Sequence, residues 1–542
     1  MNAAAKPHGT GIRRVLLGCG VWLLASSTGA CGARSGIELG RSGSGGDATI
    51  GGGNGGRTPI GGGASSGSNA GGSTGGVGTA GFANGGAEHA GAANAGATNA
   101  GTANGGTAGE GNGGAVTGGA TDGGAAGGAS DPILITDIAA KAERTCALFS
   151  DGSVKCWGSN YAGVLGYGTK TNVLEPALVG PVRVSESPGV TVTRLGGGPS
   201  QNCALLSTGS ATCWGNGDYG QLGYGNTKTI GDDELPSSVG PVSITTTPGI
   251  TVRTVEGGDI HTCALLSDGS IRCWGSRCCN GAGNADTIGD DELPSSVGPV
   301  SITTASGITS TALVANGTYT CALLSNDSVK CWGLSNLGQL GYGNTDAIGY
   351  GVLPSSVGPV SVTSTSGVTV TQLAAGYAHV CALLSDGSVK CWGWNRFGQL
   401  GYGNTKTIGD DELPASVGTV SITTNANVTV KQLAAGGRHT CALLSDGTVR
   451  CWGDDNFGQL GYGNTNVIGD DELPSSVGPV SVTTTPGVTI QRLSAGDYHT
   501  CAVLSDGSAK CWGWNHDGQL GYGNTENIGD DELPSSVGPV EH

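Results

Sequence analysis

The stretch Cys381-Ala-Leu-Leu-Ser-Asp-Gly-Ser-Val-Lys-Cys391-Trp-Gly393 occurs, with small changes, seven times in this chain. In every copy ten positions separate the two cysteines, and a Trp-Gly pair follows the second cysteine. Ser-Asp-Gly lies between two apolar, β-branched runs, and Asp-Gly in that setting is a strong signal for a β-hairpin turn. The stretch therefore predicts a hairpin repeated seven times.

Two hairpin registers are open. A two-residue turn on Asp386-Gly387 places Cys381 opposite Trp392, whereas a three-residue loop with Gly387 in a left-handed bulge places Cys381 opposite Cys391. The second register leaves the cysteines in a non-hydrogen-bonded pair, where cross-strand side chains lie closest. Because all seven copies fit it, we expect seven hairpin disulfides: Cys146–Cys156, Cys203–Cys213, Cys263–Cys273, Cys321–Cys331, Cys381–Cys391, Cys441–Cys451 and Cys501–Cys511.

The first cysteines of successive copies lie 57, 60, 58, 60, 60 and 60 residues apart, which indicates one repeated structural unit. In the sixth unit we expect strands at residues 428–433, 440–444, 448–452 and 477–483, and no stretch has a helical period. Four-stranded units repeated seven times predict an all-β fold, a seven-bladed β-propeller over residues 131–542. A stacked solenoid is the alternative, but neither end carries an atypical polar capping unit.

The sixth unit, His439-Thr-Cys-Ala-Leu-Leu-Ser-Asp-Gly-Thr-Val-Arg-Cys-Trp-Gly453 followed by Phe-Gly-Gln-Leu-Gly-Tyr-Gly463, resembles the RCC1 (regulator of chromosome condensation) repeat. The resemblance covers all seven units and implies a seven-bladed propeller. Members of that family include an intracellular nucleotide-exchange factor for a small GTPase and secreted bacterial proteins, one of which inhibits a β-lactamase. Because paired cysteines are typical of an oxidising compartment, we take the secreted bacterial type as the expectation and exchange-factor-like activity as an alternative.

Residues 1–31 have the pattern of an export signal, with Lys6, Arg13 and Arg14 before an apolar run at 15–25 that is too short for a permanent membrane span. Thr28-Gly29-Ala30-Cys31 resembles a bacterial lipobox, which predicts lipidation at Cys31; ordinary cleavage after Ala30 is the alternative. Residues 32–130 are mostly Gly, Ala, Ser, Thr and Asn and predict a disordered linker. The expected location is the cell envelope or the extracellular space, with a lipid as the one link to a membrane.

Of the 18 cysteines, 14 belong to the hairpins, and Cys278 and Cys279 interrupt the third unit. These adjacent cysteines could form a vicinal disulfide, pair with another chain or stay free, and the sequence leaves all three open. The hairpin spacing does not match the close Cys-x2-4-Cys pairs of zinc sites. We therefore predict no metal and no cofactor there.

Charge and motifs exclude some functions. Residues 131–542 hold 19 Lys and Arg against 37 Asp and Glu, and so acidic a propeller is a poor nucleic-acid binder. No Gly-x-Ser-x-Gly, His-Glu-x-x-His or phosphate-binding loop occurs, so no catalytic residue is predicted, although an enzyme of unknown chemistry in the loops remains an alternative.

Two repeated polar features have a structural and a functional interpretation. His261, His379, His439 and His499 each precede a first cysteine by two positions; a hydrogen-bonding role is favoured over a ring of metal ligands, because other units have Arg, Gln or Tyr there. The Gly-Asp-Asp-Glu loops, such as residues 409–412, lack the spacing of an EF-hand, which favours a solvated connection over a calcium site.

The residues after each Trp-Gly differ between units while their surroundings repeat, and a propeller brings such positions to one face. Exposed aromatic and arginine side chains suit recognition of a protein or a glycan, and covering the blade ends is the other explanation for them. The predicted binding residues are Tyr161, Tyr219, Trp394, Arg396, Phe397, Phe457, Trp514 and His516, centred on the fifth to seventh units. The sequence thus predicts an exported, monomeric binding or scaffold protein.

Overall fold

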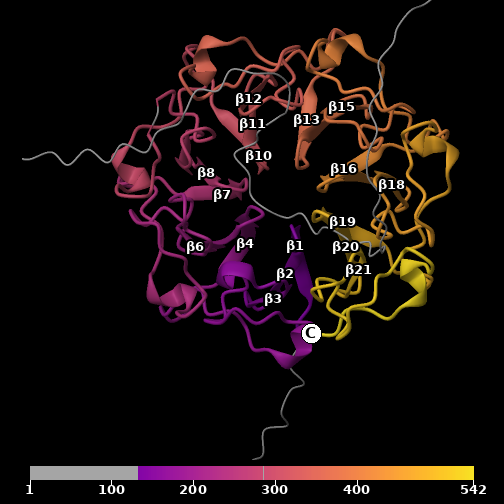
Figure 1. The fold of residues 1–542 in the computed structure, drawn as a ribbon, viewed down its shortest axis with the longest axis horizontal. Coiled ribbons are helices and arrows are strands. Elements are labelled where there is room, and N and C mark those ends of the chain that lie inside the picture. Colours follow the sequence, from indigo (N-terminus) through magenta and orange to yellow (C-terminus); the bar gives the residue numbers. More distant parts are fainter. Residues whose placement is uncertain (1–131, 285) are drawn as a thin grey trace, which may run out of the picture. The chain divides into compact units, whose positions relative to one another are not determined.

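Each of the seven repeats folds into three antiparallel strands, and these blades stand radially around one axis (Figure 1). A parallel bridge between Gly197 and Glu256 joins the inner strands of the second and third blades into one six-stranded sheet. The computed structural model describes residues 132–284 and 286–542; the predicted signal at 1–31, the linker at 32–130 and Cys31 lie outside them. β1 in the first blade contacts β19 in the last, so the repeats close into a ring and the seven-bladed β-propeller prediction is confirmed over the solenoid alternative. Within the described residues, no helix is long and apolar enough to span a membrane.

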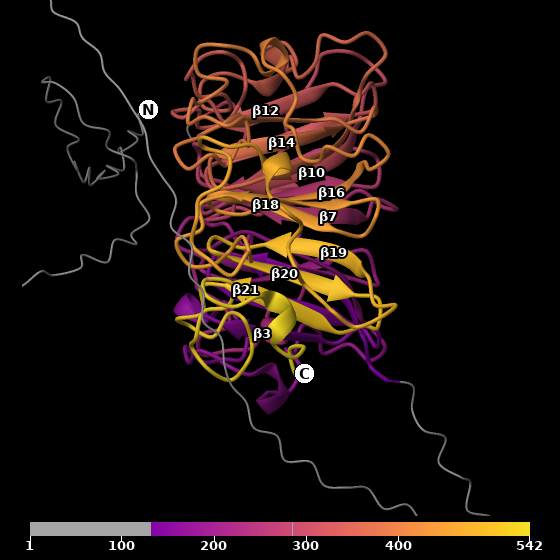
Figure 2. The ribbon, with the colours of Figure 1, turned by 90° about the vertical axis from the view of Figure 1, so that its right-hand side faces the viewer.

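Each blade has an inner, a middle and an outer strand, which run between two opposite faces of the ring (Figure 2). The inner strands are β1 (Ile135–Lys141), β4 (Val192–Gly197), β7 (Val252–Gly257), β10 (Ser310–Asn316), β13 (Val370–Ala375), β16 (Val430–Ala435) and β19 (Ile490–Ala495). The middle strands are β2 (Arg144–Phe149), β5 (Gln201–Leu206), β8 (His261–Leu266), β11 (Tyr319–Leu324), β14 (His379–Leu384), β17 (His439–Leu444) and β20 (His499–Leu504). The outer strands are β3 (Val154–Gly158), β6 (Ala211–Gly215), β9 (Ile271–Gly275), β12 (Val329–Gly333), β15 (Val389–Gly393), β18 (Val449–Gly453) and β21 (Ala509–Gly513).

Short 3₁₀ turns complete the described regular structure. They are η1 (Tyr161–Gly163), η2 (Pro176–Leu178), η3 (Pro236–Ser238), η4 (Pro294–Ser296), η5 (Pro354–Ser356), η6 (Pro414–Ser416), η7 (Pro474–Ser476) and η8 (Pro534–Ser536). A basic side chain of the outer strand reaches the carbonyl oxygens of most of these turns; Lys390 Nζ, for example, donates to Pro414 O at 3.1 Å. Several of the few lysine and arginine side chains of the propeller are therefore bonded inside the fold.

The hairpins have the register that the three-residue loop predicts. Cys381 pairs directly with Cys391, and the Cα atoms of the seven bonded pairs lie 4.0–4.1 Å apart. Gly387 has a φ of +82°, a left-handed conformation that glycine adopts without strain. Asp386 Oδ1 accepts the Ser388 N–H at 3.0 Å and fixes the turn. All seven predicted disulfides are present.

The predicted fourth strand at residues 477–483 is wrong. Only Val480 pairs with the outer strand β18, through its N–H to Val449 O at 2.8 Å. The next edge position is taken by a side chain: the Tyr462 hydroxyl contacts both the N–H and the C=O of Cys451 at 3.2 Å. Because this hydroxyl already satisfies the strand edge, a full fourth strand is not needed there.

A buried tryptophan ties five of the seven blades to the one before it; the indole N–H groups of Trp157 and Trp332 have no hydrogen-bond partner among the described residues. The tryptophans of the seven Trp-Gly pairs are fully buried, and the Trp452 indole N–H donates to Gln399 O in the preceding blade at 3.0 Å. The same bond joins Trp512 to Gln459 O at 3.1 Å. These bonds hold the loops that follow the outer strands against the next blade.

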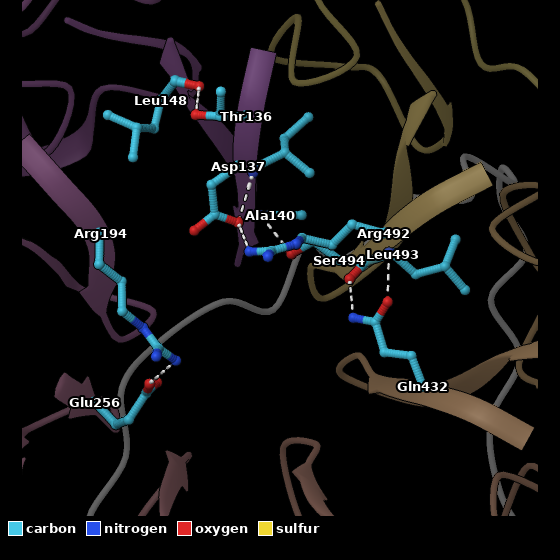
Figure 3. A network of polar contacts seen from close by, with 11 residues as sticks. Thr136, Asp137, Ala140, Leu148, Arg194, Glu256, Gln432, Arg492, Leu493 and Ser494 are labelled. Carbon is cyan, nitrogen blue, oxygen red and sulfur yellow. Dashed lines mark hydrogen bonds and ion pairs between the residues drawn. The ribbon is translucent and has the colours of Figure 1, made fainter. Parts of the chain in front are cut away.

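Several contacts between the last and first blades also occur between other blades, although the Trp157 indole N–H makes no hydrogen bond with a described residue there. The Ile135 N–H donates to Gly507 O at 2.9 Å, as Val192 does to Gly152 O at 3.2 Å one blade further. Around the axis, an ion pair of 2.6 Å joins Arg492 to Asp137 across this seam, in a network of polar contacts between inner strands (Figure 3). The ring therefore closes without exchanging a strand between its ends.

Candidate binding face

Two sets of loops meet at one end of the blades. In the sixth blade the turn 436–438 joins β16 to β17, and the loop 454–457 follows β18. They lie at the same end because His439, which begins β17, pairs with Gly453, which ends β18. We call this end of the ring, with the same loops of the other blades, the loop face.

Seven side chains from the fifth to seventh blades form a continuous cluster on the loop face. We call this cluster the aromatic–arginine strip; it consists of Trp394, Phe397, Arg438, Phe457, Tyr498, Trp514 and His516. Contacts between neighbouring loops make the cluster, because each blade contributes its turn and its loop beside those of the next.

Arg438 links the two ends of the strip. Its guanidinium carbon lies 5.0 Å from the ring centroid of Phe397, 5.7 Å from that of Trp394 and 5.4 Å from that of Tyr498. These distances are within the range of cation–π attraction. Arg438 Nη1 also lies 3.9 Å from Asp454 Oδ2, and although burial raises the pKa of Asp454, the arginine acts against that rise.

The seventh-blade end of the strip is aromatic. Phe457 lies 5.5 Å from both Tyr498 and Trp514, measured between ring centroids. Trp514 meets Tyr498 edge-to-face at 5.7 Å and stacks on His516 at 5.8 Å. Offset and edge-to-face pairs of this kind hold aromatic rings in fixed orientations, so the partly exposed rings form an ordered surface.

Buried polar side chains shape the loops beneath the strip. The Asn395 amide donates to Asn404 O at 2.7 Å and Lys406 O at 3.0 Å, and its oxygen accepts the Leu400 N–H at 2.9 Å. In the sixth blade Asp455 takes this place and accepts only the Leu460 N–H, at 2.8 Å. Burial raises the pKa of Asp455 to about 9, so the carboxyl is held in its protonated form at neutral pH.

The structure brings together five of the eight predicted binding residues: Trp394, Phe397, Phe457, Trp514 and His516. Arg396, predicted at the centre, is exposed, and no hydrogen bond or ion pair of it occurs among the described residues. Tyr161 is 76% exposed and lines a separate cavity of about 470 Å³ with Lys170 and Asp218, and Tyr219 is 48% exposed outside the strip.

Arg438 and Tyr498 are in the strip but were not predicted. Both lie three positions before a first cysteine, in the turn between inner and middle strands. The other units carry Glu, Ser, Ile, Thr and Ala at that position. The variation that singled out the residues after Trp-Gly therefore marks this second position as well.

The repeated histidines are hydrogen-bonded between blades, as the sequence favoured. His439 Nε2 lies 2.9 Å from Thr500 Oγ1, and His261, His379 and His499 make the same contact with a threonine of the next blade at 2.7–2.9 Å. Burial lowers their pKa values to about 3 or 4, so they are neutral at pH 7. In the second blade Gln201 bonds to Thr262 in their place, at 3.0 Å.

The inner turns carry carboxyl groups whose charge burial disfavours. Burial is the largest cause that raises the pKa of Glu143 to about 7, of Asp259 to about 7 and of Asp497 to about 6. The charge of Asp497 further raises the pKa of Asp259, whereas Arg144 and Arg438 lower the pKa of Asp497. The loop face is thus acidic near the axis but only partly ionised there.

The five Gly-Asp-Asp-Glu loops connect neighbouring blades. In each, one oxygen of every carboxyl lies within 4.8 Å of the others. The loops pack closely on the preceding blade, since a Cβ atom added to Gly398 would lie 2.4 Å from Asp470 N. This packing fits the connecting role that the sequence favoured.

Cys278 and Cys279 form a vicinal disulfide, which resolves the three states left open by the sequence. Cys279 is fully buried, and the neighbouring Arg277 lies 6.0 Å from the ring centroid of Tyr350. This interruption of the repeat lies in the third and fourth blades, apart from the strip's loops in the fifth to seventh.

The profile described as "Regulator of chromosome condensation (RCC1) repeat" matches residues 209–265, 326–383, 386–443 and 446–503, and a second profile of the same description matches 135–164, 370–399, 430–459 and 490–519. The chain belongs to the RCC1 repeat family. This membership confirms the resemblance drawn from the sixth unit.

Relatives of this RCC1-repeat chain include proteins of different functions. The ultraviolet-B receptor UVR8 of Arabidopsis thaliana is 29% identical over 394 residues, which cover 72% of this chain and 80% of the receptor. The probable E3 ubiquitin-protein ligase HERC6 of Homo sapiens is 31% identical over 59% of this chain, but the match spans only 28% of that protein. The ligase's activity as a whole therefore does not transfer with the repeats.

Solved structures agree on the fold. Yeast RCC1 (Prp20), solved bound to Kap60, has a TM-score of 0.53 at 23% identity, covering 76% of this chain and 85% of its own. Human WBSCR16 has a TM-score of 0.54 at 18% identity, covering 71% and 93%. Prp20p of Saccharomyces cerevisiae, also solved separately and described as binding Gsp1p and histones, has a TM-score of 0.53 at 22% identity, covering 76% of this chain and 88% of its own. At these identities the likeness shows a shared propeller.

Proposed function

We propose that this protein is an exported binding protein that recognises a partner protein through the aromatic–arginine strip. The observation that carries the proposal is the strip itself: the partly exposed rings of Trp394, Phe397 and Tyr498 lie around Arg438. Phe457 and Trp514 pack on Tyr498 and extend this ordered surface. Trp, Tyr and Arg are the side chains that most often dominate binding energy at protein interfaces. A glycan is the alternative ligand for the same aromatic surface. The identity of the captured ligand, protein or glycan, distinguishes the two.

The family and the disulfides support a binding role outside the cytoplasm. Yeast RCC1 (Prp20) was solved bound to Kap60, and Prp20p is described as binding Gsp1p and histones. Seven hairpin disulfides suit an oxidising compartment. Anchoring through a lipid on Cys31 completes the proposal; Cys31→Ser should move the protein from the membrane to the soluble fraction, and unchanged fractionation with an unmodified native N-terminus would contradict the anchor.

The strip is tested with a ligand captured from envelope or culture fractions by the full chain. Trp394→Ala and Trp514→Ala should each weaken binding of that ligand by more than about 1 kcal/mol, because each removes a large interface ring. Tyr161→Ala is the matched control, since this exposed ring lies outside the strip. Binding that survives both tryptophan changes, or loss of folding in both, would mean that the strip is structural.

A further inference from the structure

A cavity of about 320 Å³ lies beside the seventh-blade end of the strip. Its lining residues are Trp514, His516, Thr525, Glu526, Asn527, Asp530 and Asp531. The lining thus combines one indole and three carboxyl groups with no lysine or arginine. We call it the Trp514 pocket.

The fifth blade shows what occupies the corresponding position in another repeat. Gly-Tyr-Gly-Asn-Thr precedes Lys406 in the fifth blade and Glu526 in the seventh, so the two residues are equivalent. Lys406 Nζ lies 2.7 Å from Glu412 Oε1 and 4.0 Å from Asp411 Oδ1, in the acidic loop of its own blade. The loop geometry of the repeat therefore accepts an ammonium group against its carboxylates.

The seventh blade has the same acidic loop without that cation. Glu526 replaces the lysine and adds a carboxyl group where the fifth blade has a positive charge. The Asn527 amide donates to Asp530 Oδ2 at 3.2 Å, which fixes one wall of the pocket but leaves its negative charge uncompensated. Burial, with a hydrogen bond from Asp531, raises the pKa of Glu532 in the same loop to about 7.

An aromatic wall distinguishes this pocket from a bare acidic loop. Phe457 and Tyr498 support the Trp514 ring at centroid distances of 5.5 and 5.7 Å. Its stacking partner His516 is an exposed side chain, 70% accessible, which can move aside. An indole face beside carboxylates attracts a cationic group by cation–π and by direct charge attraction.

We propose that the Trp514 pocket binds a protonated lysine or arginine side chain presented by the partner protein, against the carboxyl groups of Glu526, Asp530 and Asp531. Lys406 shows only that the acidic loop of this repeat pairs with an ammonium group. This inference rests on the proposed function and gives it a chemical class of partner, a basic protein segment. A choline headgroup of a lipid has a cation too, but its adjoining phosphate would meet three carboxyl groups, so a basic peptide fits the pocket better.

The test is calorimetric titration of the full chain with acetylated, amidated pentalysine. Glu526→Lys supplies the pocket with its own cation, as in the fifth blade, and should weaken peptide binding roughly tenfold or more. Asp346→Lys is the matched control: it makes the same change of charge at the equivalent position of the fourth blade, where Leu334 stands in place of Trp514. It should leave the affinity within about twofold, since only long-range charge is altered.

Two further arms separate the outcomes. Pentalysine with acetylated side chains should not bind, and phosphocholine vesicles should not compete. Equal peptide affinity in native and Glu526→Lys proteins, or an equal loss in Asp346→Lys, would overturn the pocket. If Trp394→Ala abolishes capture of the partner while the native protein does not bind pentalysine, the proposed function is supported and the pocket is refuted. If pentalysine binding depends on Glu526 but no strip variant affects capture of the partner, the pocket is supported and the proposed function is refuted.

Discussion

At the scale of single residues, Asp455 destabilises the loop beneath the strip, because burial disfavours its charged form. It is fully buried, its Oδ2 atom has no hydrogen-bond partner, and the equivalent position is asparagine in the first, fifth and seventh blades. The asparagines supply an amide that donates to two carbonyl oxygens, whereas a carboxyl group can imitate this only when it is protonated.

We therefore expect Asp455→Asn to stabilise the protein, increasingly so at higher pH. The pKa of Asp455 rises from 3.8 to about 9 on folding, so the folded state holds a proton that the unfolded chain releases, and stability is lost as pH rises through that window. At pH 7 the gain should be about 2–4 kcal/mol, measured by guanidinium unfolding at pH 5 and pH 8 with disulfides intact. Asn515→Asp should have the opposite effect, and a gain that does not change with pH would contradict this account.

At the scale of elements, local signals predicted the hairpins and failed at the blade edge. Asp-Gly and the cysteine spacing determine the register within Cys381–Cys391, because the two strands are adjacent in sequence. The fourth strand failed because a side chain took its hydrogen bonds: the Tyr462 hydroxyl lies eleven positions from Cys451 and has no strand signal of its own. The strip was likewise predicted in part, since Arg438 contacts Trp394 and Phe397 only after the ring places the fifth and sixth blades side by side.

The tyrosine at the blade edge yields a test of that explanation. Tyr462→Phe removes the hydroxyl and leaves a buried N–H and C=O of Cys451 without partners, which should cost about 1–3 kcal/mol of unfolding free energy. Hydrogen exchange of the Cys451 amide should accelerate as well. Tyr498→Phe is the control, because no hydrogen bond of the Tyr498 hydroxyl occurs among the described residues; equal effects of the two changes would contradict the edge role.

At the scale of the whole molecule, the seam between the first and last blades is built from kinds of contact that also occur between other blades. No strand crosses it, and its backbone bond from Ile135 to Gly507 matches that from Val192 to Gly152. The ends of the ring also lie close together: Ile135 pairs with Phe149, whose ring centroid is 5.0 Å from that of His542. A ring without a special closing strand should tolerate being opened elsewhere.

We therefore expect a circular permutant of residues 132–542 to fold, with His542 joined to Pro132 by a short Gly-Ser linker and new ends in the exposed turn at 186–189. Its melting temperature should lie within about 5 °C of the unpermuted propeller, since it breaks no strand pair. Opening instead between Asp151 and Gly152 cuts the hairpin turn of the first blade, where Gly152 also accepts the inter-blade bond from Val192, and should melt lower even though the Cys146–Cys156 disulfide keeps the strands joined. If the first permutant melts as low as the second or does not fold, the seam between the first and last blades has a closing role that its contacts do not predict.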